Sequence, residues 1–133
     1  MTIVVAYADT APGRAALAEA LRAATPAGEE VILVPAVRHT PAPDPTDLGA
    51  EFATDLTSLT TAGGSVTVDH GDLADPSDSV VQIAQRRDAR RIVVGLRHRT
   101  AVGKMLLGST AQRILLDATC PVLAVKAPHG GDD

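Results

Sequence analysis

The amino-acid sequence predicts a single α/β domain in which helices cover both faces of a five-stranded parallel sheet. Five short apolar runs alternate with four segments of helical periodicity, which is typical of repeated strand–helix–strand units. The 133 residues provide for one hydrophobic core. Hydrophobic residues make up 45% of the chain and aromatic residues only 2%, so we expect an aliphatic core, as in parallel strands buried on both faces.

The first strand is expected at residues 3–7, a short apolar run. A helix should follow, because Asp9 and Thr10 can cap it and Pro12 suits a first helical turn. Its apolar face repeats with helical spacing through Leu17, Ala20, Leu21 and Ala24. Pro26 should end this helix.

The second strand is expected at residues 31–37, followed by a proline-rich connector at 40–45. One helical stripe then comprises Leu48, Phe52, Leu56 and Leu59. Gly63 and Gly64 should end this second helix.

The third strand is expected at residues 65–70, where apolar and polar residues alternate. Asp75 followed by Pro76 is a typical helix start. Val80, Ile83, Ala84 and Arg87 follow the helical spacing of this third helix.

The fourth strand is expected at residues 92–94, ending at Gly95, with a polar loop from 96 to about 104. Gly108 and Ser109 should open the fourth helix. Its face would carry Ala111, Ile114, Leu115 and Ala118, and residues 121–126 would form the fifth strand. The expected domain therefore covers residues 1–127, and 128–133 is expected to be a flexible tail.

Charge and cysteine content narrow the function classes. The net charge of −4 argues against a general nucleic-acid-binding surface. Seven basic residues nevertheless gather between positions 86 and 104, which favours a small anionic ligand: Arg86, Arg87, Arg90, Arg91, Arg97, Arg99 and Lys104. A single cysteine, Cys120, excludes an internal disulfide and a cysteine-based metal cluster. The chain shows neither a basic leader nor a long apolar run, so we expect a cytoplasmic protein without a membrane segment.

The loop after the fourth strand has the features of a phosphate site. In open parallel sheets, ligands bind outside the carboxyl ends of the strands, where the strand order reverses. Gly95 and Gly108 permit close backbone approach, and the helix that begins at Ser109 offers free N–H groups and the positive end of its dipole. The sequence lacks both the Walker spacing around Gly103 and the dinucleotide fingerprint, which excludes these two better-known nucleotide loops.

Residues 92–95, 102–116 and 120–126 resemble the universal stress protein family. The ATP-binding motif of that family is Gly, two residues, Gly, nine residues, Gly and then Ser or Thr. Gly95 matches the first glycine, Gly108 and Ser109 match the final pair, and His98 stands at the second glycine. ATP-binding members usually end their first strand with an Asp; that position falls near Ala8, whereas the acid of this chain is Asp9.

The resemblance implies a three-layer α/β/α, flavodoxin- or Rossmann-like fold with strand order 3-2-1-4-5. It also implies a non-enzymatic protein of stress response or signalling that binds ATP or a related adenine nucleotide, with Mg²⁺ accompanying the nucleotide. Adenine would contact Val37, Val94 and Val122, and the remaining ligand-binding candidates would be Asp9, Gly95, Arg97, His98, Gly108, Ser109 and Thr110. A homodimer would form through the fifth strand, Pro121 to Lys126.

One alternative remains open at this stage. The departures at Ala8 and His98 are also those expected of a dimeric, stress-related interaction protein that no longer binds ATP.

Overall fold

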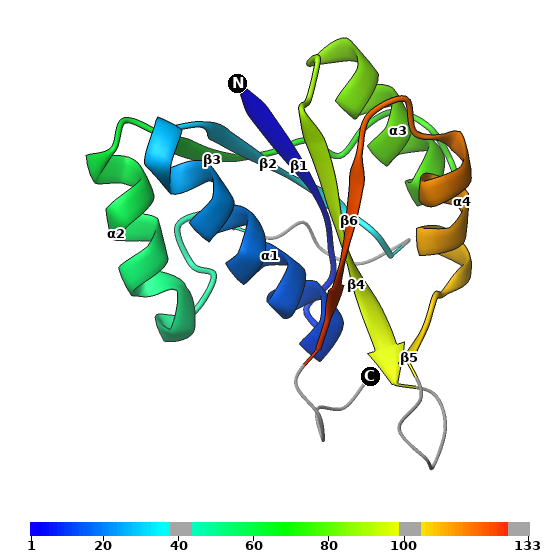
Figure 1. Ribbon diagram of the computed structural model, residues 1–133, viewed down its shortest axis with the longest axis horizontal. Coiled ribbons are helices and arrows are strands. Elements are labelled where there is room, and N and C mark those ends of the chain that lie inside the picture. Colours follow the sequence, from blue (N-terminus) through cyan, green and yellow to red (C-terminus); the bar gives the residue numbers. More distant parts are fainter. Residues whose placement is uncertain (38–43, 99–104, 128–133) are drawn as a thin grey trace.

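The computed structural model describes residues 1–37, 44–98 and 105–127, and these form a parallel sheet between two helical layers (Figure 1). The parallel strands are β1 (Thr2–Tyr7), β2 (Glu30–Pro35), β3 (Ser65–Val68), β4 (Arg91–His98) and β6 (Val122–Lys126). Their order across the sheet is β3-β2-β1-β4-β6. The predicted five-stranded parallel sheet, with order 3-2-1-4-5 for successive parallel strands, is therefore confirmed.

Two helices cover each face of the sheet. The helices are α1 (Ala11–Ala24), α2 (Ala53–Thr61), α3 (Pro76–Arg86) and α4 (Ser109–Asp117). In Figure 1, α1 and α2 lie on one side of the strands and α3 and α4 on the other. Alternate residues of β1 divide between two separate cores: Ile3 and Val5 pack with α1, whereas Val4 and Ala6 pack with α3 and α4.

Several element boundaries differ from the sequence predictions. The second helix does not begin at Leu48: a 3₁₀ turn, η2 (Ala50–Phe52), precedes α2, and Gly49 adopts a φ of 109° that interrupts a helix. Leu48 still reaches the core from this irregular segment. Another 3₁₀ turn, η1 (Thr25–Ala27), follows α1 at Pro26, as the proline predicts.

The predicted loop from residue 96 is the clearest boundary error. Strand β4 continues through Leu96 and Arg97 to His98, and it pairs there with an antiparallel two-residue strand, β5 (Met105–Leu106). The polar residues Arg97 and His98 make this extension look like a loop in the sequence. The segment lies beyond the buried part of the sheet, so it needs no apolar face.

No helix in the described ranges is both long and apolar enough to cross a lipid bilayer.

A buried ion pair ties the chain together at the amino end of the sheet. The Glu29 side chain is 3% exposed and accepts hydrogen bonds from Nε and Nη2 of Arg90, both at 2.7 Å. Arg90 also donates to the carbonyl oxygen of Ala23 over 3.3 Å. The hydrogen bonds from Arg90 hold the pKa of Glu29 below its ordinary value. This pair therefore joins the end of α1 to the start of β4.

The lowered pKa of Glu29 predicts a pH-dependent contribution to stability. The contribution is complete above the pKa of an unfolded-chain Glu, about 4.3, and is lost as the pH falls through the lower folded-state value. Glu29→Gln should therefore cost about 2 kcal/mol at neutral pH, and its deficit should shrink below about pH 4. Urea denaturation at several pH values measures this. Glu19→Gln, which weakens an exposed pair with Arg22, is the control and should change stability by less than about 0.5 kcal/mol. An equal deficit at every pH would contradict the assignment.

Candidate functional site

A cavity opens at the carboxyl ends of β1 and β4, where the chain turns from the sheet into helices on opposite faces. The starts of α1 and α4 both line it, together with the end of β4 and the segment that follows β2. This is the position that the rule for open parallel sheets predicts for a ligand.

The first turn of α1 is pressed against the end of β1. Thr10 caps the helix by accepting a hydrogen bond from the N–H of Gly13 over 3.2 Å. A Cβ atom on Gly13 would lie 2.0 Å from the carbonyl oxygen of Ala8, so only glycine fits at this contact. Thr10, Pro12 and Gly13 were not predicted as site residues from the sequence, although all three line the cavity. The helix-capping pattern at Thr10 was the sequence signal that could have identified them.

Gly95 is required by packing within the protein itself. A Cβ atom at this position of β4 would lie 2.2 Å from the carbonyl oxygen of Pro12 and 2.7 Å from its Cβ. Gly95 thus allows α1 to approach β4 closely, while its backbone still lines the cavity. From the sequence, this glycine is predicted to allow close approach of a phosphate; its contact with Pro12 of α1 explains it independently.

Gly108 has a different environment. It is the N-cap of α4 with φ −68° and ψ 168°, an extended conformation that any residue adopts, and no side chain caps this helix. A Cβ atom here would meet only the Arg97 side chain, at an ordinary 3.5 Å. The described neighbours therefore do not demand glycine at position 108, and the lack of a side chain leaves space in front of the N-terminus of α4.

Arg97 supplies the positive charge of the cavity. Its side chain lines the cavity and lies beside Gly108, at the start of α4. Among the described residues, no carboxylate lies within ion-pair distance of its guanidinium group. Arg97 and the N-terminus of α4 therefore present donors and positive potential at the same place, which suits an anion.

The structure brings seven of the ten predicted site residues together around the cavity. They are Val37, Val94, Gly95, Arg97, Gly108, Ser109 and Thr110. Ser109 is the first residue of α4 rather than its cap, and Thr110 is half-buried beside it. Four alanines that were not predicted as ligand contacts also contribute to the walls: Ala6, Ala8, Ala36 and Ala111.

Asp9 is held away from the cavity. Its carboxylate accepts a 2.7 Å hydrogen bond from Nη1 of Arg14, and the Asp9 side chain is 79% exposed. Arg14 also binds Glu51 and the carbonyl oxygen of Leu48, and its guanidinium lies 4.8 Å from the ring centre of Phe52. The wall position at the end of β1 belongs to Ala8 instead.

Two further candidates do not join the lining in the described part of the chain. Val122 pairs with Ile92 near the amino end of β4, whereas Gly95 pairs with Val125 at the carboxyl end. The backbone of His98 continues β4 opposite Met105, and the His98 side chain lies outside what the structure describes.

Cys120 behaves as a packing residue. It is partly buried against the cluster that includes Val94 and Ile114, and burial raises the pKa of its thiol. A raised pKa lowers the fraction of reactive thiolate, which agrees with the interpretation of Cys120 as a small apolar residue.

Comparison with known proteins identifies the family. The model of the universal stress protein family matches residues 1–126. The chain belongs to the universal stress protein family. A universal stress protein of Mycolicibacterium smegmatis is 52% identical over 56 residues, which are 42% of this chain and 42% of that protein. One from Methanocaldococcus jannaschii is 42% identical over 53 residues, 40% of this chain and 31% of the relative. The chain thus aligns with less than half the length of these curated relatives.

Solved universal stress protein structures share the whole fold. One from Archaeoglobus fulgidus is 25% identical with a TM-score of 0.63, covering 94% of this chain and 97% of that one. The A. fulgidus protein in complex with dAMP is 23% identical with a TM-score of 0.59, covering 94% and 96%. A universal stress protein in complex with cAMP is 22% identical with a TM-score of 0.55, covering 95% and 97%.

The contrast between the two glycines predicts that a single methyl group has a large effect on stability at Gly95 and a small one at Gly108. Gly95→Ala should destabilise the fold by about 3 kcal/mol, because its Cβ atom would overlap the Pro12 backbone. Gly108→Ala should change stability by less than about 1 kcal/mol, because its Cβ atom makes an ordinary contact with a flexible side chain. Urea denaturation of both variants measures the difference. Equal losses would contradict the packing assignments.

Proposed function

We propose that this protein binds an adenine nucleotide, with ATP as the first candidate, and serves in stress response or signalling in the cytoplasm. The observation that carries the proposal is the convergence of Arg97 and the N-termini of α1 and α4 on one cavity. Family membership supports it, as do the fold relatives that hold dAMP and cAMP.

The phosphate end of the proposed ligand lies against α4. The hydroxyl groups of Ser109 and Thr110 and the guanidinium of Arg97 are donors at this end. The first N–H groups of a helix lack partners within the helix, so they add further donors. Gly108 leaves room for the phosphate to approach them.

The base end lies against the apolar part of the cavity. Val94 of β4 is buried, and Val37, after β2, is 44% exposed. Together with Ala8 and Ala36 they offer a small apolar surface to a planar base. Asp9 takes no part in this arrangement, because Arg14 binds its carboxylate.

Mg²⁺ has no suitable protein ligands among the described lining residues. The ion prefers carboxylate and water oxygens, whereas the described lining carries hydroxyl groups and one guanidinium. We therefore propose that Mg²⁺ enters only as part of a nucleotide complex, bound by its phosphates.

Binding without turnover is the favoured activity. The described lining residues include neither a carboxylate nor an imidazole that could act as a general base. This composition supports a protein that holds its ligand rather than one that hydrolyses it.

We expect Arg97→Gln to weaken ATP binding about tenfold, because it removes one charge-assisted contact with a phosphate. Isothermal titration with ATP, in Mg²⁺ and in EDTA, measures the affinity. Arg22→Gln is the matched control, since Arg22 is an exposed residue in the last turn of α1 and its loss should leave the affinity unchanged. Absence of heat with the wild-type protein would contradict the proposed function, and unchanged affinity of Arg97→Gln would contradict the role of Arg97.

We also propose a homodimer that pairs through the edge strand β6. Val122, Leu123 and Val125 are only half-buried there, and Leu116 of the neighbouring α4 is 81% exposed. An exposed apolar edge favours pairing with another strand. The second candidate function is that of a dimer that does not bind a nucleotide. The position of Asp9 favours it, because Arg14 holds the Asp9 carboxylate outside the cavity.

Ala124→Lys should convert this dimer to a monomer, because it places a charge on the exposed edge strand. Analytical ultracentrifugation at micromolar concentration reports the mass. Thr57→Lys, at an exposed position of α2, is the control and should remain dimeric. A wild-type protein with monomer mass would contradict the dimer.

A further inference from the structure

The helix that supplies the proposed phosphate contacts has a narrow attachment to the sheet. Within α4, Ala111 and Ile114 are the buried residues, while Leu115 and Leu116 face outward with 51% and 81% exposure. The helix packs more extensively on α3 than on β4. The position of α4 at the cavity therefore depends largely on its contact with α3.

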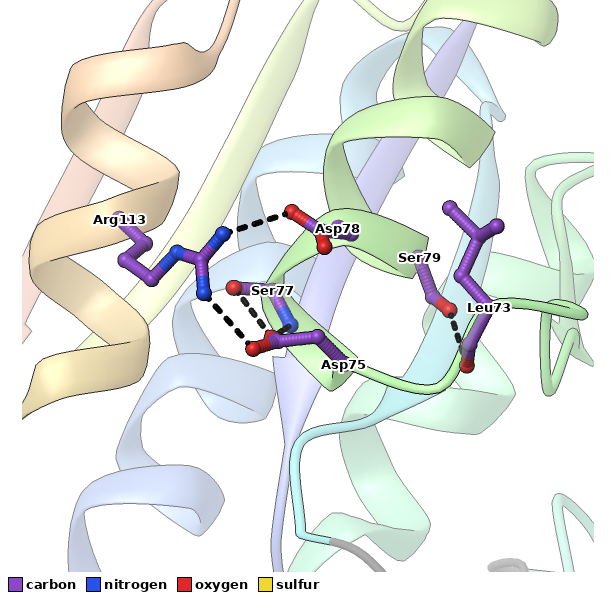
Figure 2. A network of polar contacts seen from close by, with 6 residues as sticks. All are labelled: Leu73, Asp75, Ser77, Asp78, Ser79 and Arg113. Carbon is purple, nitrogen blue, oxygen red and sulfur yellow. Dashed lines mark hydrogen bonds and ion pairs between the residues drawn. The ribbon is translucent and has the colours of Figure 1, made fainter.

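Arg113 connects α4 to the start of α3. Its Nη1 donates to Oδ2 of Asp75 over 2.8 Å, and its Nη2 donates to Oδ1 of Asp78 over 3.2 Å. Figure 2 shows the guanidinium reaching from α4 between the two carboxylates. One arginine thus binds two points in the first turn of α3, and this fixes an orientation as well as a distance.

The first turn of α3 is itself well fixed. Asp75 is the N-cap of α3 and accepts a 2.8 Å hydrogen bond from the N–H of Ser77. The Ser79 hydroxyl donates to the carbonyl oxygen of Leu73 over 3.4 Å, which ties down the preceding turn (Figure 2). Ser77 and Ser79 are each 1% exposed. Arg113 therefore binds the start of α3, which is itself held in place by hydrogen bonds.

We propose that Arg113 is a positioning residue of the nucleotide site: it holds α4 against α3 so that Ser109 and Thr110 face the cavity. Arg113 follows Ser109 by four residues and lies about 6 Å further along the helix, on the same side. It does not belong to the cavity lining, so it acts through the placement of α4. This inference rests on the proposed nucleotide function for its ligand, but its effect on α4 is independent of any ligand.

Removal of Arg113 should affect the site more than the fold. Exposed ion pairs contribute little to overall stability, and the Arg113 side chain is 51% exposed. Gly108, the N-cap of α4, has no side chain with which to cap the helix, so without Arg113 this end is freer to shift or fray. Weaker binding with nearly unchanged melting temperature is the expected combination.

The first test compares Arg113→Met with Arg87→Met. Arg87 is a matched control, because it also forms an exposed ion pair between elements, with Glu30 at the amino end of the sheet, away from the cavity. We expect Arg113→Met to weaken ATP binding about tenfold in isothermal titration, and both variants to show similar small shifts in melting temperature. Arg113→Lys should fall between wild type and Arg113→Met, because an ammonium group can bind one carboxylate but lacks the fork of the guanidinium.

The second test needs no ligand. Amide hydrogen exchange measured by NMR should be faster at residues 112–115, whose N–H groups form the first hydrogen bonds of α4, in Arg113→Met than in wild type, with unchanged exchange in β1. Should wild type bind no ATP, the proposed function fails and this exchange result alone decides whether Arg113 positions α4. Unchanged exchange at 112–115 would overturn the inference. Faster exchange throughout β1 would also overturn it, as would faster exchange at 112–115 with unaltered ATP affinity in a protein that binds ATP.

Discussion

Close packing of the first turn of α1 against β1 and β4 is the constraint on which the rest of the site depends. Gly13 lies against the backbone of Ala8, and Gly95 lies against the backbone of Pro12. Both contacts exclude even a methyl group, so two glycines far apart in the sequence fix one helix end. The cavity is the space that remains beside this contact, and its second wall is the start of α4.

The N-termini of α1 and α4 are held in place by different kinds of contact. Backbone contacts through glycine hold α1, and these permit little adjustment. Buried Ala111 and Ile114 pack α4 into the core, and the exposed ion pairs of Arg113 join it to α3. One wall of the cavity is therefore rigid by backbone packing, whereas the other depends in part on exposed polar groups that solvent and charge can influence.

The layers could be predicted from the sequence because apolar periodicity determines which faces are buried, whereas the strand order was implied by the resemblance to the family. The N-cap of α3 at Asp75 and the buried face of α1 that includes Leu17 could likewise be predicted. Three features could not be predicted from the sequence. The extension of β4 to His98 carries polar residues, so its pattern resembles a loop. Asp9 could not be excluded from the site, because its partner Arg14 is identified only by the fold.

The third feature is the physical reason for each of the two glycines that match the family motif. Gly95 and Gly108 appear equivalent in the motif, yet one relieves a contact within the protein and the other leaves open space. The spacing of glycines in a sequence shows where side chains are absent, but it does not show which atoms lie in the space that a side chain would fill. Only the positions of Pro12 and Arg97 distinguish the two cases.

The short pairing between β4 and β5 has a consequence for the engineering of this protein. Arg97 and His98 pair with Leu106 and Met105, so the two ends of the intervening six-residue segment are fastened to each other. Changes of length or composition between those ends are therefore separated from the placement of Gly108. Residues inserted between His98 and Met105 should leave the start of α4 in place, because the β4–β5 pairing lies between the insertion and the helix.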